Sequence, residues 1–376
     1  MRTVKDTSCN YTLNVLARVF VGLVFLFSSF VKGVDPMGTS FKIQEYMTAW
    51  SIGGLSFDWA LPMADFLAVA LVTAEFIVGV LLLTNSFRRL SAWLLALMML
   101  FFTVTTLIDA LTNKVTDCGC FGDAVKLTNW QTFWKNVILD VPTVWIFLTR
   151  NLRRQRRFER DSLIFILSGA AMVAFAIFNI CNEPCIDFRP WKVGNQMMQT
   201  DPSLKMESFV SYRDRQTGEV VEVESVRCAD YENDSVRWEC VGTRVVDPHE
   251  IQAPGFSMLD QSGDDWAMDL IGSPDSLVIV TIHHLDKMDA KGTDAINRLT
   301  RWSEQEGLQL VFLTSALVEQ MQAFLHEQGI DQFDFYFADA TAIETMARSN
   351  PGVLLLKDGR VIGKWHYRNI DKLMGN

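Results

Sequence analysis

The sequence lacks internal repeats and low-complexity tracts, and its 376 residues include only 10 prolines and 22 glycines. These absences exclude collagen-like repeats and long disordered segments. Seven cysteines in a chain of this length also exclude a small disulfide-rich scaffold. Hydrophobic residues instead make up 49% of the chain, and the mean hydropathy is +0.14. Soluble globular chains usually fall below zero, so the apolar residues must be concentrated in one part of the chain.

Clustered basic residues are missing from the second half of the chain. Residues 186–376 hold 18 Lys and Arg against 31 Asp and Glu, whereas residues 1–185 hold 16 against 13. Contacts with phosphate groups need clustered cations, so this acidic half argues against nucleic-acid binding. The first half is membrane-like, and the second half is typical of an acidic soluble domain.

Five apolar stretches in the first half indicate membrane spans, because about 20 helical residues cross a hydrocarbon core of about 30 Å. They cover Leu13–Val31, Trp59–Leu83, Leu90–Ala110, Phe133–Leu148 and Leu163–Ile180. The fourth stretch is short and needs its flanking residues to reach both interfaces. No small-residue cleavage site follows the first stretch, so we expect a retained span there and not a signal peptide.

Basic residues predict how these spans are oriented. They precede the first span, separate the second from the third, and are densest between the fourth and fifth, at 150–160. In a five-span protein these segments share one side, and the positive-inside rule makes that side cytoplasmic. We therefore expect a multi-pass protein of the inner (cytoplasmic) membrane, with the lipid bilayer around it. Its N-terminus is cytoplasmic and its C-terminal domain is periplasmic.

The second half shows two successive patterns of secondary structure. Residues 207–246 alternate between polar and apolar side chains, which predicts a small antiparallel β unit. From about residue 276, buried strands alternate with helices near 295–306, 317–328 and 343–348. The chain then ends in a hairpin with its turn at Asp358-Gly359.

Six of the seven cysteines fall on the predicted outer side, where an oxidising compartment permits disulfides. Cys118 and Cys120 lie before the fourth span, and Cys181 and Cys185 follow the fifth, so both pairs are expected at one membrane surface. A C-x-C pair closes only a small strained ring, which is easily reduced and suits an exchanging disulfide.

Several interpretations of these cysteines stay open. The two pairs form an exchanging relay, or they cross-link as structural disulfides between the two loops. A four-cysteine metal site is a third interpretation, although zinc sites usually space paired cysteines by two or more residues. Cys228 and Cys240 are expected on neighbouring strands of the β unit, where a hairpin disulfide is the simplest expectation.

Glu75 is an ionisable residue well inside the second span. A lone carboxylate at that depth is costly, so we expect it to be protonated, paired or facing a polar cavity. Lys32 and Asp35, at the end of the first span, offer a partner. The functional interpretation is a pocket for a quinone or a proton path, and the alternative is a hydrogen bond between helices that fixes their packing.

Residues 11–150 resemble the DoxX/MauE group of four-helix membrane proteins. The resemblance rests on the run Arg18–Pro36, on Glu75, and on CGCFGD at Cys118–Asp123, which is the most specific motif. Relatives of this kind mature a disulfide-rich methylamine dehydrogenase subunit or belong to a thiosulfate:quinone oxidoreductase. The group also resembles the quinone-linked disulfide-forming enzymes of the DsbB and vitamin K epoxide reductase kind. The resemblance implies thiol or quinone chemistry, with a quinone as the electron acceptor.

Residues 254–376 resemble a thioredoxin-like domain, through the order of strands and helices and the segment SNPGVLLLKDG. The resemblance makes Pro351 the cis-proline and places the family's C-x-x-C where this chain has His283 and His284. Because 254–376 contain no cysteine, dithiol exchange by this domain is excluded, and a groove for an extended peptide remains. Adjacent histidines on a strand point to opposite faces, which disfavours a shared metal or base role.

The sequence therefore predicts a polytopic α-helical membrane bundle followed by a small β unit and an α/β thioredoxin-like domain outside the membrane. The expected parts are a four-helix domain over 1–160, a fifth span over 161–185, a linker with the β unit over 186–253, and the thioredoxin-like domain over 254–376. Two functions follow: a quinone-linked thiol–disulfide oxidoreductase, or a non-catalytic maturation or assembly factor that docks client or envelope proteins. A transporter is disfavoured, because no broken helices or inverted repeat is apparent.

Overall fold

The computed structural model describes residues 8–49, 58–115, 122–125, 127–151, 158–201 and 203–375. The chain divides into two compact units, Met1–Arg189 and Pro190–Asn376. This boundary lies close to the predicted change from membrane-like to acidic sequence at residue 186. Each unit is described by itself.

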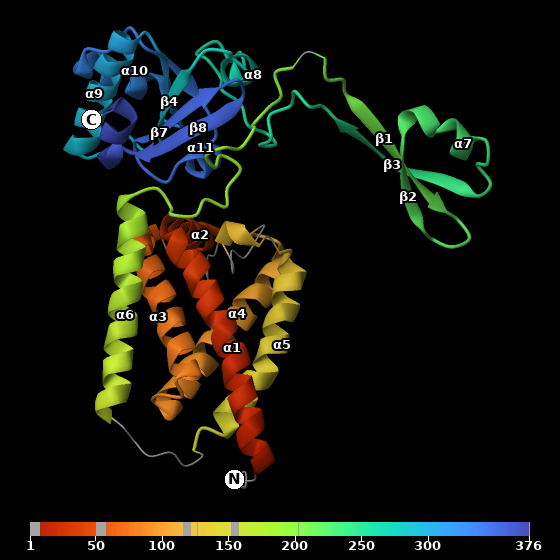
Figure 1. The fold of residues 1–376 in the computed structure, drawn as a ribbon, viewed down its shortest axis with the longest axis vertical. Coiled ribbons are helices and arrows are strands. Elements are labelled where there is room, and N and C mark those ends of the chain that lie inside the picture. Colours follow the sequence, from red (N-terminus) through yellow and green to blue (C-terminus); the bar gives the residue numbers. More distant parts are fainter. Residues whose placement is uncertain are drawn as a thin grey trace. The chain divides into compact units, whose positions relative to one another are not determined.

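The first unit is a bundle of α-helices joined by short connections (Figure 1). Its long helices are α1 (Ser8–Val34), α3 (Ala64–Leu83), α4 (Arg88–Thr112), α5 (Asn129–Leu148) and α6 (Phe158–Cys181). The shorter α2 (Pro36–Ala49) follows α1, and single 3-10 turns η1 (Asp58–Met63) and η2 (Gly122–Ala124) precede α3 and α5. Apolar side chains cover the outside of the bundle, as expected for a protein whose solvent is lipid.

Four helices in the described part of the chain are long and apolar enough to cross a membrane. They are Asn10–Val34, Trp59–Leu83, Arg88–Thr112 and Phe158–Cys181. The remaining apolar stretch, 133–148, which is the fourth predicted span, lies in α5 but is not among them, so a total of five spans stays a prediction. Over a membrane-length stretch, helix α5 is less apolar than the other four long helices of the bundle, because its buried face includes four polar residues. These are Asn129, Thr132, Asn136 and Thr143, beside Leu139 and Ile146.

Two glycines let α1 and α3 approach each other closely. A Cβ atom added at Gly22 would lie 3.2 Å from the carbonyl oxygen of Gly79, and one added at Gly79 would lie 3.2 Å from that of Gly22. Small residues at such crossings let helix backbones pack closely in membranes, where no hydrophobic effect drives association. The crossing places the polar side chains of α1 and α3 within reach of each other.

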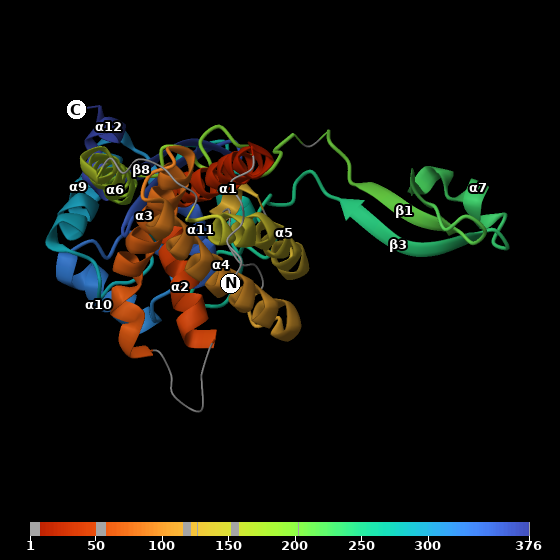
Figure 2. The ribbon, with the colours of Figure 1, turned by 90° about the horizontal axis from the view of Figure 1, so that it is seen from below.

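The second unit begins with the predicted antiparallel β unit. It contains β1 (Glu207–Asp214), β2 (Val220–Glu224) and β3 (Trp238–Val246), in the order β2-β1-β3. The short helices η3 (Ser225–Arg227) and α7 (Ala229–Glu232) join β2 to β3, and α7 lies beside the β1–β3 ladder (Figure 2). There Tyr231 of α7 stacks on Tyr212 at 5.1 Å and meets Trp238 edge-on at 5.0 Å.

The rest of the second unit is a five-stranded sheet with helices on both faces. Its strands are β4 (Leu277–Ile282), β5 (Gln309–Thr314), β6 (Asp334–Phe337), β7 (Gly352–Lys357) and β8 (Arg360–His366), in the order β6-β5-β4-β7-β8. Strands β4, β5 and β6 are parallel, whereas β7 is antiparallel to both β4 and β8. All six residues of the central strand β4 are buried, because both faces of the sheet are covered.

The two faces of this sheet form two hydrophobic clusters. Helices α8 (Ala267–Ile271) and α11 (Ala340–Met346) cover one face together with Trp191 and Met258. Helices α9 (Ala290–Glu306) and α10 (Val318–Gln328) cover the other, followed by η4 (Tyr367–Asn369) and α12 (Asp371–Met374). Alternate residues of β4 and β5 contribute to opposite clusters, as the period of two along a strand requires.

The hairpin between β7 and β8 turns at the predicted Asp358-Gly359 pair, where φ is positive at both residues, 49° and 70°. A Cβ atom at Gly359 would also overlap the carbonyl oxygen of Met198. We expect Gly359→Ala to destabilise the second unit more than Gly329→Ala, where φ is 67° but no atom lies within 4 Å of the added Cβ. In both variants the left-handed backbone conformation costs alanine about 1–2 kcal/mol of unfolding free energy. The difference between their unfolding free energies therefore measures the overlap of the Cβ atom at position 359 with Met198. Equal losses in chemical denaturation would contradict this.

His249 links the two connections that join the β unit to the rest of the chain. Its Nδ1 lies 2.8 Å from the carbonyl oxygen of Gln199, and its Nε2 lies 3.2 Å from that of Leu204. A neutral imidazole donates through one nitrogen and an imidazolium through both. These two hydrogen bonds to the backbone therefore raise the pKa of His249 above its usual value.

This geometry predicts a pH dependence of the two connections. The pKa of His249 is higher in the folded state than in the unfolded state, where it is about 6.5. The stabilisation that His249 gives the two connections is therefore complete below about pH 6.5, and it is lost as the pH rises through the folded-state pKa. We expect protease cleavage beside the β unit to become faster in the wild-type chain as the pH rises above the usual histidine pKa of about 6.5. His249→Gln is expected to remove that change, after cleavage of an unrelated substrate corrects for the protease's own pH profile. The same pH dependence in both proteins would refute the role of His249.

Candidate functional site

A buried ion pair lies between α1 and α3. The Nζ of Lys32 donates to Oε1 of Glu75 at 2.6 Å, and the hydroxyl of Ser28 donates to Oε2 at 3.0 Å. Glu75 is 1% exposed and Lys32 is 7% exposed. Lys32 supplies the partner that the sequence suggested for Glu75, so this carboxylate is paired at both oxygens.

The same lysine also faces α4. Its Nζ lies 5.5 Å from the centre of the Phe102 ring, which places the positive charge over an aromatic face. Phe102 also supplies a carbonyl oxygen to the amide of Asn136 at 3.3 Å, and Asn136 donates to Thr106 at 3.1 Å. The Lys32–Glu75 pair of α1 and α3 therefore lies beside the aromatic ring of Phe102 on α4, and Asn136 joins α5 to that same residue.

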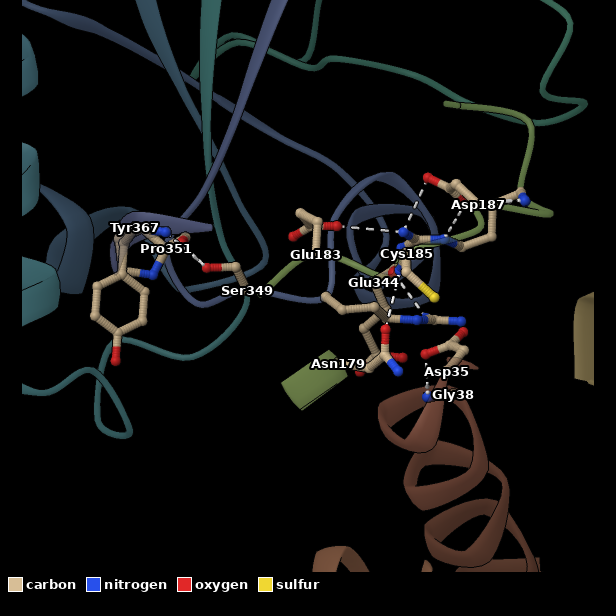
Figure 3. Close-up of polar contacts among 12 residues, drawn as sticks. Asp35, Gly38, Asn179, Glu183, Cys185, Asp187, Glu344, Ser349, Pro351 and Tyr367 are labelled. Atoms are coloured by element: carbon tan, nitrogen blue, oxygen red, sulfur yellow. Dashed lines mark hydrogen bonds and ion pairs between the residues drawn. The ribbon is translucent and has the colours of Figure 1, made fainter. Parts of the chain in front are cut away.

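The segment that carries Cys185 is fixed to the end of α1 through Asn179 of α6. The Nδ2 of Asn179 donates to the carbonyl oxygen of Gly33 at 3.0 Å. The Oδ1 of Asn179 accepts from the backbone N–H of Cys185 at 3.0 Å (Figure 3). Cys181 is the last residue of α6, and Cys185 is an exposed free thiol. One asparagine thus ties this cysteine segment to the residue that follows Lys32.

Arg189 holds the same segment in place from its other side. Its guanidinium donates to both carboxylate oxygens of Asp187, at 2.7 and 3.0 Å, and to Glu183 at 3.3 Å (Figure 3). Burial acts to lower the pKa of Arg189, but the carboxylates of Asp187, Asp35 and Glu183 outweigh it and raise the pKa. Arg189 is therefore a buried permanent cation that fixes residues 183–187.

Cys118 and Cys120 fall within 116–121, which lie outside the described residues. The residues on either side of them are fixed to the bundle. Val115 is fully buried, and its carbonyl oxygen accepts from Nδ2 of Asn129 at 2.8 Å. A Cβ added at Gly122 would lie 3.3 Å from Val31 of α1. One flank of the C-x-C motif therefore meets α1 one residue before Lys32.

The predicted disulfide between Cys228 and Cys240 is not formed in this structure, where both are free thiols. The sequence predicts that Cys228 lies on a strand. In the structure it lies between η3 and α7 instead. Cys240 lies on β3 opposite Tyr212, whose hydroxyl hydrogen-bonds Glu232 at 3.3 Å. The aromatic cluster around Tyr212 packs this end of the β unit without a cross-link.

Asn350 connects the end of β4 to the start of β7 in the second unit. Its Oδ1 accepts from the backbone N–H of His283 at 3.0 Å, and its Nδ2 donates to the carbonyl oxygen of His284 at 2.7 Å. The peptide bond between Asn350 and Pro351 is cis. Ser349 accepts from the backbone N–H of Tyr367 at 3.1 Å and donates to the carbonyl oxygen of Pro351 (Figure 3).

The histidines after β4 do not assemble a metal centre. In the described part of the chain no group of three His, Cys, Asp or Glu side chains is placed to hold a metal ion. Burial lowers the pKa of His284, which favours the neutral ring. The segment 283–284 is instead fixed by Asn350, a residue that the sequence did not single out.

Sequence reasoning missed the residues that position the site. Asn179 is a polar residue near the end of an apolar span, two residues before the first cysteine of the C-x3-C pair, and that placement is the signal that could have identified it. Ser28 lies one helical turn before Lys32, which is the spacing that brings both side chains to one carboxylate. Arg189 carried no comparable signal, because its partners are recognised only in the folded segment.

The long apolar helices and their buried ion pair define a multi-pass α-helical membrane protein. Residues 10–149 match the family described as methylamine utilisation protein MauE. Residues 10–149 are therefore similar to MauE, and the match ends before α6. Neither the curated proteins nor the solved structures contain a match to this chain.

Proposed function

We propose that this MauE-like protein takes part in thiol–disulfide chemistry on the outer side of the inner membrane. The observation that carries the proposal is the convergence on the end of α1. Gly122 packs beside Val31, Asn179 bonds to Gly33, and Lys32 between them pairs with Glu75. Both cysteine pairs therefore adjoin segments anchored within three residues of one helix.

The proposed reaction is a disulfide exchange followed by electron transfer. A client dithiol attacks the Cys118–Cys120 disulfide, a mixed disulfide forms, and the client leaves oxidised while both cysteines become thiols. Two electrons and two protons then pass to a Cys181–Cys185 disulfide, or to a membrane quinone, which becomes the quinol. The Lys32–Glu75 pair is the polar group inside the bundle nearest to these segments along α1.

Serine substitution tests this proposal. We expect Cys118→Ser or Cys120→Ser to abolish client oxidation while the protein remains folded and abundant, with the remaining cysteine trapping a mixed disulfide. Cys228→Ser and Cys240→Ser are the matched controls, because both are free thiols in the second unit and are expected to leave oxidation unchanged. Loss of abundance in the Cys118 and Cys120 variants, without a trapped mixed disulfide, would refute exchange.

The alternative function is a non-catalytic maturation or assembly factor. In this proposal 254–376 form a thioredoxin-like domain that docks client or envelope proteins. The strand order β6-β5-β4-β7-β8 and the cis bond before β7 support it. The side chain of Asn350 bonds to the backbone of His283, just after β4. No cysteine occurs in 254–376, so such a domain binds its partner without exchanging thiols. Cysteine variants that retain client binding and maturation would favour this alternative.

A further inference from the structure

Asp109 presents a buried oxygen for which the described part of the chain supplies no donor. This residue lies in the last turn of α4 and is fully buried. Its Oδ2 accepts a hydrogen bond from the hydroxyl of Tyr46 of α2 at 2.6 Å. Its Oδ1 is buried and has no hydrogen-bond partner among the described residues. A buried carboxylate is normally paired, fully hydrogen-bonded or bound to a metal ion, so this oxygen lacks a positive partner.

A second oxygen without a donor lies on Asn129, the first residue of α5. Its Nδ2 donates to the carbonyl oxygen of Val115 at 2.8 Å, to Oδ1 of Asn113 at 3.0 Å and to the carbonyl oxygen of Asp109 at 3.5 Å. Three acceptors around Nδ2 fix the orientation of the amide, because a flipped amide would lose all three bonds. Oδ1 of Asn129 is buried and also lacks a donor within the described ranges. The amide of Asn129 thus reaches the backbone carbonyl of Asp109, and among the described residues each of the two has one side-chain oxygen without a donor.

The electrostatic surroundings favour a cation at this position. The C-terminal end of a helix carries a partial negative charge, and basic side chains usually compensate it. The last turn of α4 has no basic residue and contains Asp109 instead. The charged side chains acting on Asp109 are Glu45 and Lys42, which pair with each other at 2.7 Å. Their charges largely cancel, so the carboxylate of Asp109 and the end of α4 leave net negative charge.

We propose that Asp109 Oδ1 and Asn129 Oδ1 bind a single sodium ion between the end of α4 and the start of α5. Carboxylate and amide oxygens are hard donors, which suit alkali and alkaline-earth ions more than zinc or copper. One carboxylate balances one positive charge, and a neutral pair is the least costly to bury, which selects a monovalent ion. Helix C-terminal ends hold sodium ions in the same way in transporters with broken helices.

The test compares thermal unfolding of the full-length protein in NaCl and in choline chloride at equal ionic strength. We expect the wild-type Tm to rise saturably with sodium, by about 2–4 °C for each kcal/mol of binding. Asp109→Asn is expected to abolish this rise. The matched control is Asp65→Asn, which removes a carboxylate bonded to Ser40 in the same bundle and is expected to keep the rise. Equal wild-type Tm values in the two salts would overturn the proposal, as would a full sodium response in Asp109→Asn.

A direct binding measurement keeps the test decisive if Asp109→Asn fails to fold. The wild-type protein in detergent is incubated with radioactive ²²Na⁺ and separated from free ion. We expect about one ion per chain, displaced by unlabelled sodium and not by choline. No retained ion would overturn the proposal and would mean that water alone fills the space beside Asp109. This site does not depend on the proposed thiol chemistry, so either can fail without the other.

Discussion

Glu75→Leu is expected to destabilise the membrane unit by about 3–5 kcal/mol, because it leaves the buried charge of Lys32 without its partner. Nζ of Lys32 lies 2.6 Å from Oε1 of Glu75, and the two side chains are only 9% and 1% exposed. Solvent therefore cannot replace either partner. Lys32→Met is expected to cost a similar amount for the same reason. The measurement is the shift in the thermal unfolding midpoint of the full-length protein in detergent.

The double variant Lys32→Met/Glu75→Leu separates the two interpretations of Glu75. Replacing both charges by apolar side chains of similar volume removes the desolvation cost, so we expect most of the stability to return. If Glu75 acts only in packing, this variant is stable and active. If the pair serves a quinone or a proton path, it is stable and loses quinone-dependent turnover.

A surface pair provides the control for this cycle. Lys42 and Glu45 of α2 form an ion pair of 2.7 Å whose side chains are 26% and 38% exposed. Exposed pairs contribute about 0–1 kcal/mol, so Lys42→Met/Glu45→Leu and its single variants are expected to change stability little. Single losses in the Lys32–Glu75 pair that are no larger than these would contradict the importance of its burial.

Arg189→Gln is expected to cost about 3–5 kcal/mol and to release the segment that carries Cys185. The side chain of Arg189 is 1% exposed, and its loss removes the guanidinium that joins Asp187 to Glu183. The segment 183–187 is then held through Asn179 alone among the contacts described above. We therefore expect faster alkylation of Cys185 in addition to a lower unfolding midpoint.

Arg244→Gln is the matched control for Arg189. Arg244 also makes two bonds to one carboxylate, at 3.1 and 3.2 Å to Glu222, but its side chain is 58% exposed. The same chemistry on the surface is screened by solvent, so the substitution is expected to change stability little and to leave Cys185 alkylation unchanged. Similar effects of both substitutions would show that burial of Arg189 is not what fixes the segment.

The sequence predicts features that depend on local pattern. Apolar runs located the helices, alternation located the β unit, and the Asp358-Gly359 pair located the last hairpin. Lys32 was found because it shares the apolar run of the first span, where few other charges are available to meet Glu75. Each of these features is encoded within a few helical turns or one strand pair.

Long-range contacts could not be predicted in the same way. Asn179 and Gly33 are 146 residues apart, and the sequence around one residue does not indicate contact with the other. The position of Cys228 was wrong because a short helical segment between β2 and β3 was taken for a strand. The pairing of Asp109 with Tyr46 and Asn129 likewise depends on how α2, α4 and α5 pack, which periodicity does not specify.

Residue-resolved alkylation trapping in intact membranes tests the central proposal most directly. Free thiols at Cys118, Cys120, Cys181 and Cys185 are labelled before and after quinone is added, and the labelled positions are identified by mass spectrometry. Thiol–disulfide chemistry predicts that Cys118 and Cys120 are labelled when the quinone pool is reduced and become protected when it is oxidised. Four cysteines that stay as disulfides through mild reductant, with or without quinone, would contradict the proposal and leave a structural role.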